Sequence, residues 1–203
     1  MNTIDKQTYK ISEDNYYKLK QEKRQIVIGN SLRKNYYHIT HLQHKEMGKT
    51  KEWNTFTISR EGVIYQHYKP CYYTDYLNIK KADKQSISIV LENMGGLYKI
   101  KSGDYINWLN EQCDEGYVVR KNFFGQKFWE EYRDLQLNSL VNLCGYLCNQ
   151  FNIRKKVMDM HFYNKNAQSF DGVLIRGNYF EDDPNTNPTL DLQKLNELIS
   201  KND

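Results

Sequence analysis

Two segments near the middle of the chain alternate apolar and polar residues in the manner of half-buried β-strands. In NTFTISREGVIYQHY (54–68), Phe56 and Ile58 alternate with threonine and serine, and a Glu-Gly pair then leads into Val-Ile-Tyr. In QSISIVLEN (85–93), isoleucine and leucine alternate with smaller residues. A period of two predicts strands, and a turn pair between two such runs predicts a β-hairpin. We expect residues 54–93 to form the centre of a sheet.

The flanking segments predict further strands and helices. The β-branched run in RQIVIGN (24–30) predicts a strand, and residues 173–175 predict a short one. Residues 35–47 predict a helix that stops at Gly48. The clearest helix covers 135–152, where apolar residues recur every three or four positions after Asp134, a suitable N-cap. A terminal helix is predicted between Leu192 and Ile199.

At 203 residues the chain is long enough for one core, and we expect one domain. Residues 1–23, polar and rich in tyrosine and lysine, predict an N-terminal arm with room for a short helix at 14–22, and residues 24–203 predict the domain. An insertion at about 94–127 predicts a long surface excursion with one small hairpin around 117–121. The aromatic side chains there predict an interface or, as the alternative, a satellite core: they are Trp108, Phe123, Phe124 and Trp129.

Composition excludes several classes of protein. The formal net charge is +4, with both signs interspersed, which argues against nucleic-acid binding. No apolar run approaches the roughly 18 residues that span a bilayer, and the first residues lack a secretory signal, so we expect synthesis in the cytoplasm. Four cysteines in a chain of this size do not predict a disulfide scaffold. Cys144 and Cys148 predict core packing, although their spacing also fits half a metal site. Seventeen tyrosines fit an interface or a coding bias.

Taken in order, these segments resemble the zinc-dependent N-acetylmuramoyl-L-alanine amidases, a family that includes phage T7-type lysozyme and the peptidoglycan recognition proteins. The matching segments are RQIVIGN, FTISREGVIYQ, SISIVLEN, DLQLNSLVNLCGYLCNQFNI and FDGVLIRGNYFEDDPNTNPTLDLQKL, which span roughly residues 24–199. The resemblance implies a mixed α/β fold, with a central mixed β-sheet flanked by helices. It also implies a zinc ion held by two histidines and a third ligand, which activates water against an amide bond of peptidoglycan.

The chain departs from this family at the positions that the resemblance assigns to the site. The first metal histidine falls on Gly29 or Asn30, and a tyrosine or equivalent just before the FTIS strand falls on Asn54 or Thr55. A histidine of the connecting loop falls on Tyr76, and a glutamate of the central strand falls on Val90.

The remaining ligands are also altered. The second metal histidine falls on Arg176, and the last ligand falls among Asp182, Asp183, Asn185 and Asn187. Arginine carries a permanent positive charge and cannot bind a cation. We therefore predict no catalytic residues and no cofactor, with Gly29, Asn30, Asn54, Tyr76, Val90, Arg176 and Asp183 marking a degenerate site.

Two weaker site hypotheses stay open. A displaced zinc site would draw on the histidines, among which His38, His41 and His44 share a predicted helix and are joined by His67, by His161 and by the carboxylate of Asp75. The alternative is a solvated helix. A ligand-binding groove without metal would use Arg176, Tyr76, Asp75 and Trp108, with the arginine pairing with substrate carboxylates.

The sequence thus carries three functional hypotheses. The first is a non-catalytic phage structural protein in the virion tail or collar, made in the bacterial host cytoplasm and assembled with other phage subunits, with peptidoglycan as a further contact. Its basis is the altered site together with a Lys/Asn/Tyr/Ile bias typical of AT-rich viral genomes. The second is a peptidoglycan-binding pseudoenzyme, and the third is an active zinc amidase with displaced ligands.

Overall fold

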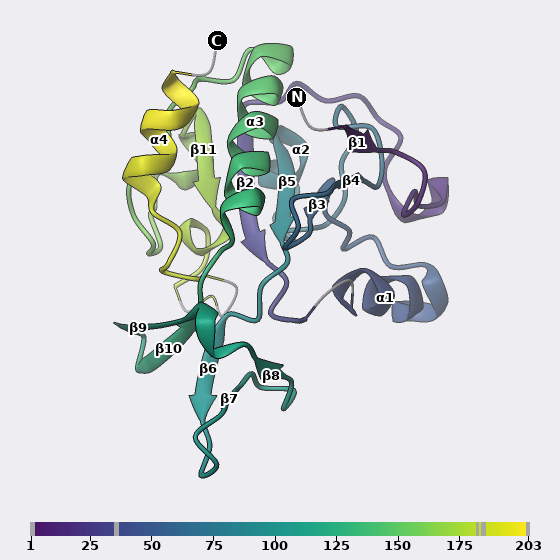
Figure 1. The fold of residues 1–203 in the computed structure, drawn as a ribbon. Coiled ribbons are helices and arrows are strands. Elements are labelled where there is room, and N and C mark those ends of the chain that lie inside the picture. The colour runs from purple at the N-terminus through teal and green to yellow at the C-terminus, as the bar shows by residue number, and fades with distance from the viewer. Residues whose placement is uncertain (1–2, 35–36, 182, 184–185, 202–203) are drawn as a thin grey trace.

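A six-stranded mixed sheet forms the centre of the protein (Figure 1). The structure, a computed structural model, describes residues 3–34, 37–181, 183 and 186–201. The strand order is β1-β4-β3-β5-β2-β11. The strands are β1 (Ile4–Asp5), β2 (Gln25–Asn30), β3 (Phe56–Ile58), β4 (Ile64–Gln66), β5 (Ser86–Leu91) and β11 (Gly172–Ile175). Only β3 and β4 pair antiparallel in this sheet, as the predicted hairpin, and the other pairs are parallel.

Two helices cover one face of this sheet. α3 (Asp134–Phe151) and α4 (Leu192–Ser200) pack on it; in Figure 1, α3 lies in front of the sheet near β2, and α4 lies on the side of β11. Leu140, Leu143 and Leu147 of α3 are fully buried against the alternating isoleucines of β2 and β5. α2 (Lys80–Gln85) lies behind the sheet. The predicted mixed α/β fold with a helix-flanked sheet is confirmed. α3 begins one residue earlier than predicted, since Arg133 is the N-cap and Asp134 is helical.

The remaining helical segments are short. α1 (Tyr37–His44) is followed by a 3-10 turn that ends at Gly48, the predicted stop, and residues 35–36 of the predicted helix lie outside the described chain. The 3-10 turns are η1 (Glu13–Asn15), η2 (Lys45–Gly48), η3 (Glu115–Tyr117), η4 (Ala167–Ser169) and η5 (Arg176–Asn178).

The segment predicted as a surface excursion with one hairpin forms a second sheet instead. Its order is β8-β7-β6-β10-β9, all antiparallel, from β6 (Gly96–Lys99), β7 (Tyr105–Ile106), β8 (Gln112–Cys113), β9 (Val118–Phe123) and β10 (Gln126–Glu130). The hairpin turn lies at 124–125, later than predicted. These strands bury a small cluster around Met94, Leu97 and Cys113. The prediction missed β7 and β8 because they have two residues each, too few to show a period of two.

The predicted arm lies along the edge of the central sheet. Ile4 pairs with Ile64 in register, and Ile11 joins a buried cluster with Trp53. The predicted short helix is wrong: among the described residues of this segment only Glu13–Asn15 is helical, and Tyr17 forms a bridge with Tyr73. The cause is tyrosine stacking, since these two rings lie 4.7 Å apart and nearly parallel.

The described chain contains no disulfide, because all four cysteines are free. Cys144 and Cys148 are buried in the core of α3, as predicted, and burial raises the pKa of both thiols. Within the described ranges, we find no helix with the length and apolarity that a membrane span needs.

Candidate functional site

Three of the positions that the resemblance assigns to the site, Gly29, Val90 and Arg176, lie in one row across the central sheet. Gly29 of β2 pairs in register with Val90 of β5, and Val90 pairs with Thr57 of β3. Arg176 follows the last residue of β11 directly. Neighbouring residues on a strand face opposite sides, and Ile28 and Ile89 pack towards α3. The row therefore faces away from α3 and α4.

Tyr76 fills the space above Gly29. A Cβ atom placed on Gly29 would lie 1.9 Å from the Tyr76 hydroxyl oxygen and 3.3 Å from its ring. The glycine is therefore required by close packing of a side chain rather than by backbone conformation. Burial raises the pKa of the Tyr76 hydroxyl far above its usual value. Tyr76 is thus a neutral packing group on the first position of the row.

Arg176 is held by three neighbours. It forms an ion pair with Asp183, whose side chain is 1% exposed. Its guanidinium carbon lies 4.6 Å from the ring centroid of Phe180 and 5.9 Å from that of Tyr76. Such cation–π contacts and a charge partner fix the guanidinium in place. Asp182 and Asn185, which the sequence also offered as ligands, lie outside the described residues.

Asn54 belongs to a buried hydrogen-bonded chain that joins two histidines. The His38 Nε2 lies 3.1 Å from Asn54 Oδ1, and Asn54 Nδ2 donates to Thr57 Oγ1 at 2.9 Å. Thr57 Oγ1 lies 2.8 Å from His67 Nε2, and His67 Nδ1 lies 2.9 Å from the Tyr9 carbonyl oxygen.

The hydrogen bonds between His38 and the Tyr9 carbonyl all run in one donor-to-acceptor direction. Because the Tyr9 carbonyl can only accept, His67 Nδ1 donates to it, and a neutral His67 accepts from the Thr57 hydroxyl at Nε2. His38 then donates to Asn54 through Nε2. Burial lowers the pKa of both histidines to about 4, so both are neutral at physiological pH. These imidazoles are occupied as hydrogen-bonding groups of the core.

The other three histidines, His41, His44 and His161, are not part of this hydrogen-bonded series. His41 and His44 are exposed on α1, and His161 Nε2 lies 2.9 Å from the Leu190 carbonyl oxygen. Asp75 accepts a hydrogen bond from the Tyr17 hydroxyl at 2.9 Å.

The zinc site implied by the resemblance does not fit these residues. Across the described ranges, no three His, Cys, Asp or Glu side chains converge as a metal site would require. At the expected place stand a glycine under a tyrosine ring and an arginine cation, and none of these groups binds zinc.

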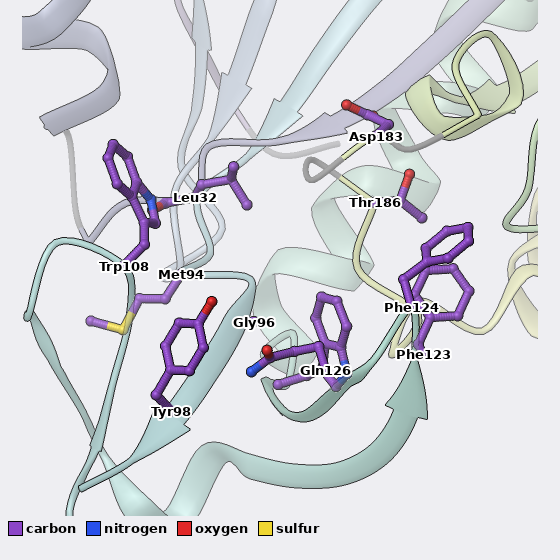
Figure 2. A pocket seen from close by; sticks show the side chains of 11 residues that line it. Leu32, Met94, Gly96, Tyr98, Trp108, Phe123, Phe124, Gln126, Asp183 and Thr186 are labelled. Carbon is purple, nitrogen blue, oxygen red and sulfur yellow. The ribbon is translucent and has the colours of Figure 1, made fainter.

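A groove opens between the second sheet and the segments that carry Leu32, Asp183 and Thr186 (Figure 2). Its volume is about 560 Å³. We call it the aromatic groove and define it by its lining residues, which are Leu32, Met94, Gly96, Tyr98, Trp108, Phe123, Phe124, Gln126, Trp129, Asp183 and Thr186. Figure 2 shows Trp108 and Leu32 on one side and Phe123 and Phe124 on the other. This size and apolar lining are typical of ligand or partner sites.

The sequence identified part of this groove. Trp108 and Phe124 are 54% and 55% exposed, as their prediction as interface residues requires. Trp129, predicted among them, is instead buried, because its ring packs on Phe123 and its Nε1 donates to the Lys121 carbonyl oxygen at 2.8 Å. Sequence reasoning missed Tyr98, since a lone tyrosine on an unpredicted strand carries no periodic signal.

Comparison with known proteins adds the fold class. No family model matches the chain, and no curated protein matches it. Solved structures do match: N-acetylmuramoyl-L-alanine amidase LysC from Clostridium intestinale URNW has a TM-score of 0.56 at 14% identity, over 98% of this chain and 99% of that one. A mutant endolysin from Bacillus subtilis has a TM-score of 0.57 at 13% identity, over 98% of both chains.

A third structure is similar over a smaller share of its own length. It is the complex of the N-acetylmuramyl-L-alanine amidase AmiD from E. coli with an anhydro-muramoyl peptide substrate, with a TM-score of 0.56, 15% identity and coverage of 89% of this chain and 59% of that one. The chain therefore has the fold of the N-acetylmuramoyl-L-alanine amidases and endolysins, as the sequence resemblance predicted.

Proposed function

We propose that this chain is a non-hydrolytic protein of amidase fold that acts as a binding or assembly subunit. One observation carries the proposal: the Tyr76 hydroxyl occupies the space above Gly29, where the resemblance expects the first metal histidine. The second expected histidine is Arg176, whose cation is matched by Asp183. A zinc ion placed there would meet a like charge and a bulky neutral ring, so the row offers no means of activating water.

The setting we propose is the phage particle, as a subunit of the tail or collar that is made in the bacterial host cytoplasm. The similarity to endolysins supports this setting, because the fold can be retained as a scaffold when its chemistry is lost. Exposed aromatic side chains on the second sheet support contact with other phage subunits.

Peptidoglycan binding without hydrolysis is the second candidate, and the aromatic groove next to Asp183 favours it. The AmiD structure is a complex with a peptidoglycan fragment, which makes such a fragment a natural ligand to test. Arg176 is a weak carboxylate receptor in this role, because Asp183 already pairs with it. A bound carboxylate would have to displace that ion pair.

Zinc content and cell-wall hydrolysis, measured on the same preparation, test the proposal. We expect neither stoichiometric zinc nor release of L-alanine-bearing peptides. Zinc at one ion per chain together with such release would overturn it and support an active amidase with displaced ligands. A sacculus pull-down then separates the two non-hydrolytic roles: binding that survives Arg176→Lys but is lost in Trp108→Ser would favour peptidoglycan recognition through the groove.

A further inference from the structure

The net positive charge of the protein is concentrated at one end of the central sheet. Two adjacent hollows there, with volumes of about 500 and about 330 Å³, share Arg24 as a wall. We call the two hollows the basic track, after the six basic side chains that line it: Arg24, Lys80, Lys81, Lys84, Arg154 and Lys156. The acidic side chains of its lining are Glu22 and Asp171, which leaves a balance of +4. This balance equals the formal net charge of the whole chain, so the charges of all other residues cancel.

The basic track lies at the end of the central sheet opposite the second sheet. Arg24 directly precedes β2, Gln85 directly precedes β5, and Asp171 directly precedes β11. These three strands are parallel, so the track lies at their N-terminal ends. The second sheet lies at the other end, to which the arrows of β2 and β5 point in Figure 1. A ligand in the track therefore leaves the aromatic groove uncovered.

Hydrogen bonds join the segments that carry these cations. The Arg24 N–H donates to the Gln85 carbonyl oxygen at 2.9 Å, and the Gly172 N–H donates to the Arg24 carbonyl oxygen at 3.0 Å. The buried Lys23 ammonium donates to the Lys84 carbonyl oxygen at 2.9 Å, at the end of α2. The sheet thus fixes the backbone positions of the cations in advance, which lowers the cost of ordering them on binding.

This clustering of cations opposes folding. Arg24 lies 3.9 Å from the Asp171 carboxylate, at the limit of an ion pair. In the part of the chain that the structure describes, no carboxylate forms an ion pair with Lys80, Lys81 or Lys156. Gathered like charges repel each other and disfavour the compact state. Stability alone therefore does not account for the track, whereas a bound polyanion would relieve the repulsion.

The chemistry of the lining indicates which polyanion it suits. Among the lining residues, all within the described chain, Phe170 is the only apolar one, and it is half-buried against the cluster of Leu77 and Leu174. A protein interface has an apolar core, and a membrane-surface site inserts apolar side chains. A single nucleic-acid strand stacks its bases on exposed aromatic rings. The track offers charge along two connected hollows, which suits a flexible linear polymer that carries phosphates and no bases.

We propose that the basic track binds a linear, base-free phosphodiester polymer, such as poly(glycerol phosphate), through its phosphate oxygens. Four of the six cations are lysines, whose ammonium groups act on phosphate as compact point charges. This inference goes beyond the proposed function and does not depend on it, because the track and the altered site lie at opposite ends of the central sheet.

Fluorescence anisotropy of end-labelled poly(glycerol phosphate), titrated with the full chain, tests the track. We expect binding that weakens as the salt concentration rises, because counterions are released from the polymer. Lys80→Gln/Lys81→Gln should raise the dissociation constant at least about tenfold. It should also reduce the slope of the salt dependence by about one per lysine. Both side chains are exposed, so this variant keeps the fold.

Lys101→Gln/Lys127→Gln is the matched control. It removes the same charge from exposed lysines of the second sheet and the β6–β7 loop, and it should keep the affinity of the wild type. A wild type that does not bind at low salt overturns the proposal, as does an equal loss in the two double variants.

Two further probes separate the other polyanions. Single-stranded DNA with the same number of phosphates should bind no more tightly than the polymer. Binding that is tighter by about tenfold or more would show that bases stack on the protein, and would overturn the proposal in favour of a nucleic-acid site. Tighter binding to phosphatidylglycerol vesicles at equal phosphate concentration would identify a membrane surface and likewise overturn it.

Discussion

The two sheets of this protein differ in how completely their strands are buried. In the six-stranded sheet, every residue of β2 and β5 is buried, and α3 and α4 close one face. In the five-stranded sheet, β9 at the edge has no fully buried residue, and its small core is centred on Met94, Leu97 and Cys113. The first sheet holds most of the buried apolar surface, which stabilises the fold. The second sheet and its loops carry the exposed side chains of Tyr98, Trp108 and Phe124.

The two sheets meet at a buried ion pair. Arg60, in the β3–β4 turn, forms two hydrogen bonds of 2.8 Å with the carboxylate of Glu130 at the end of β10. The side chains are 5% and 6% exposed. Glu130 also accepts from the Met94 backbone N–H. The second sheet is therefore held to the first at a few polar contacts whose loss leaves a buried charge.

The largest predicted effect comes from breaking this pair. Glu130→Gln should lower the free energy of unfolding by about 3–5 kcal/mol, because Arg60 remains as an unpaired buried cation. Urea denaturation gives the value. Glu13→Gln removes the exposed Lys18–Glu13 pair and should change the free energy of unfolding far less, because solvent screens that pair. Equal costs for the two variants would show that the two sheets do not depend on the buried pair.

Lowering the pH should reduce the free energy of unfolding, because His67 is buried in its neutral form. Its pKa is about 4 in the fold and 6.5 in the unfolded chain, so the unfolded state binds the proton first as pH falls. Stability should decline from about pH 6.5 to about pH 4, by roughly 3 kcal/mol.

The contribution of His67 is measured by denaturing the wild type and His67→Gln at several pH values. The wild type should lose more free energy of unfolding than the variant as the pH falls. The comparison is needed because burial raises the pKa of Glu92 to about 7, and that group contributes stability that is lost as pH rises. A His67 imidazole signal in NMR that titrates near pH 6.5 would refute the prediction directly.

The contact between Gly29 and Tyr76 should give the next largest change in the free energy of unfolding. Gly29→Ala should cost about 1–3 kcal/mol, because its Cβ would overlap the Tyr76 hydroxyl oxygen. Tyr76→Phe removes that oxygen and leaves the ring carbon 3.3 Å from the new Cβ, so the double variant should recover most of the loss. Thermal unfolding of the two single variants and the double variant forms the cycle. Additive effects would mean that the two groups are not in contact.

The smallest effect should appear in the second sheet and have the opposite sign. Phe124→Asn should raise the free energy of unfolding by about 0.5–1 kcal/mol, because asparagine tolerates the positive φ that strains phenylalanine. Chemical denaturation at low protein concentration, where association does not contribute, measures it. A destabilised variant would show that the Phe124 ring supports the fold instead of a binding surface.

The sequence predicted the first sheet well because its signals are local and repeated. Burial on one or both faces left alternating or continuous apolar runs in β2, β3 and β5, and α3 carries eighteen residues of helical period. The second sheet has strands as short as two residues, so no window contains the pattern.

The sequence predicted which positions of the candidate site are altered. It did not predict which side chains contact one another there. The sequence indicated that Gly29, Tyr76 and Arg176 replace ligands, and the structure brings them together. It gave no sign that Asn54 would join His38 to His67, because those hydrogen bonds depend on side-chain rotamers in α1, in β3 and in the loops beside β3 and β4. Asp75, which directly precedes Tyr76, lies with Tyr17 instead, since adjacent loop residues face different surroundings.

The contact between Tyr76 and Gly29 also fixes the order in which a metal site could be installed. A histidine at position 29 would collide with the phenol before it could reach any ion, so that change is harmful while Tyr76 remains. Position 76 must become smaller first, and a variant with only that change leaves a cavity and no ligand. Each single step therefore loses stability and contributes no activity. Steric packing alone requires at least two ordered substitutions before position 29 of this chain could hold a zinc ligand.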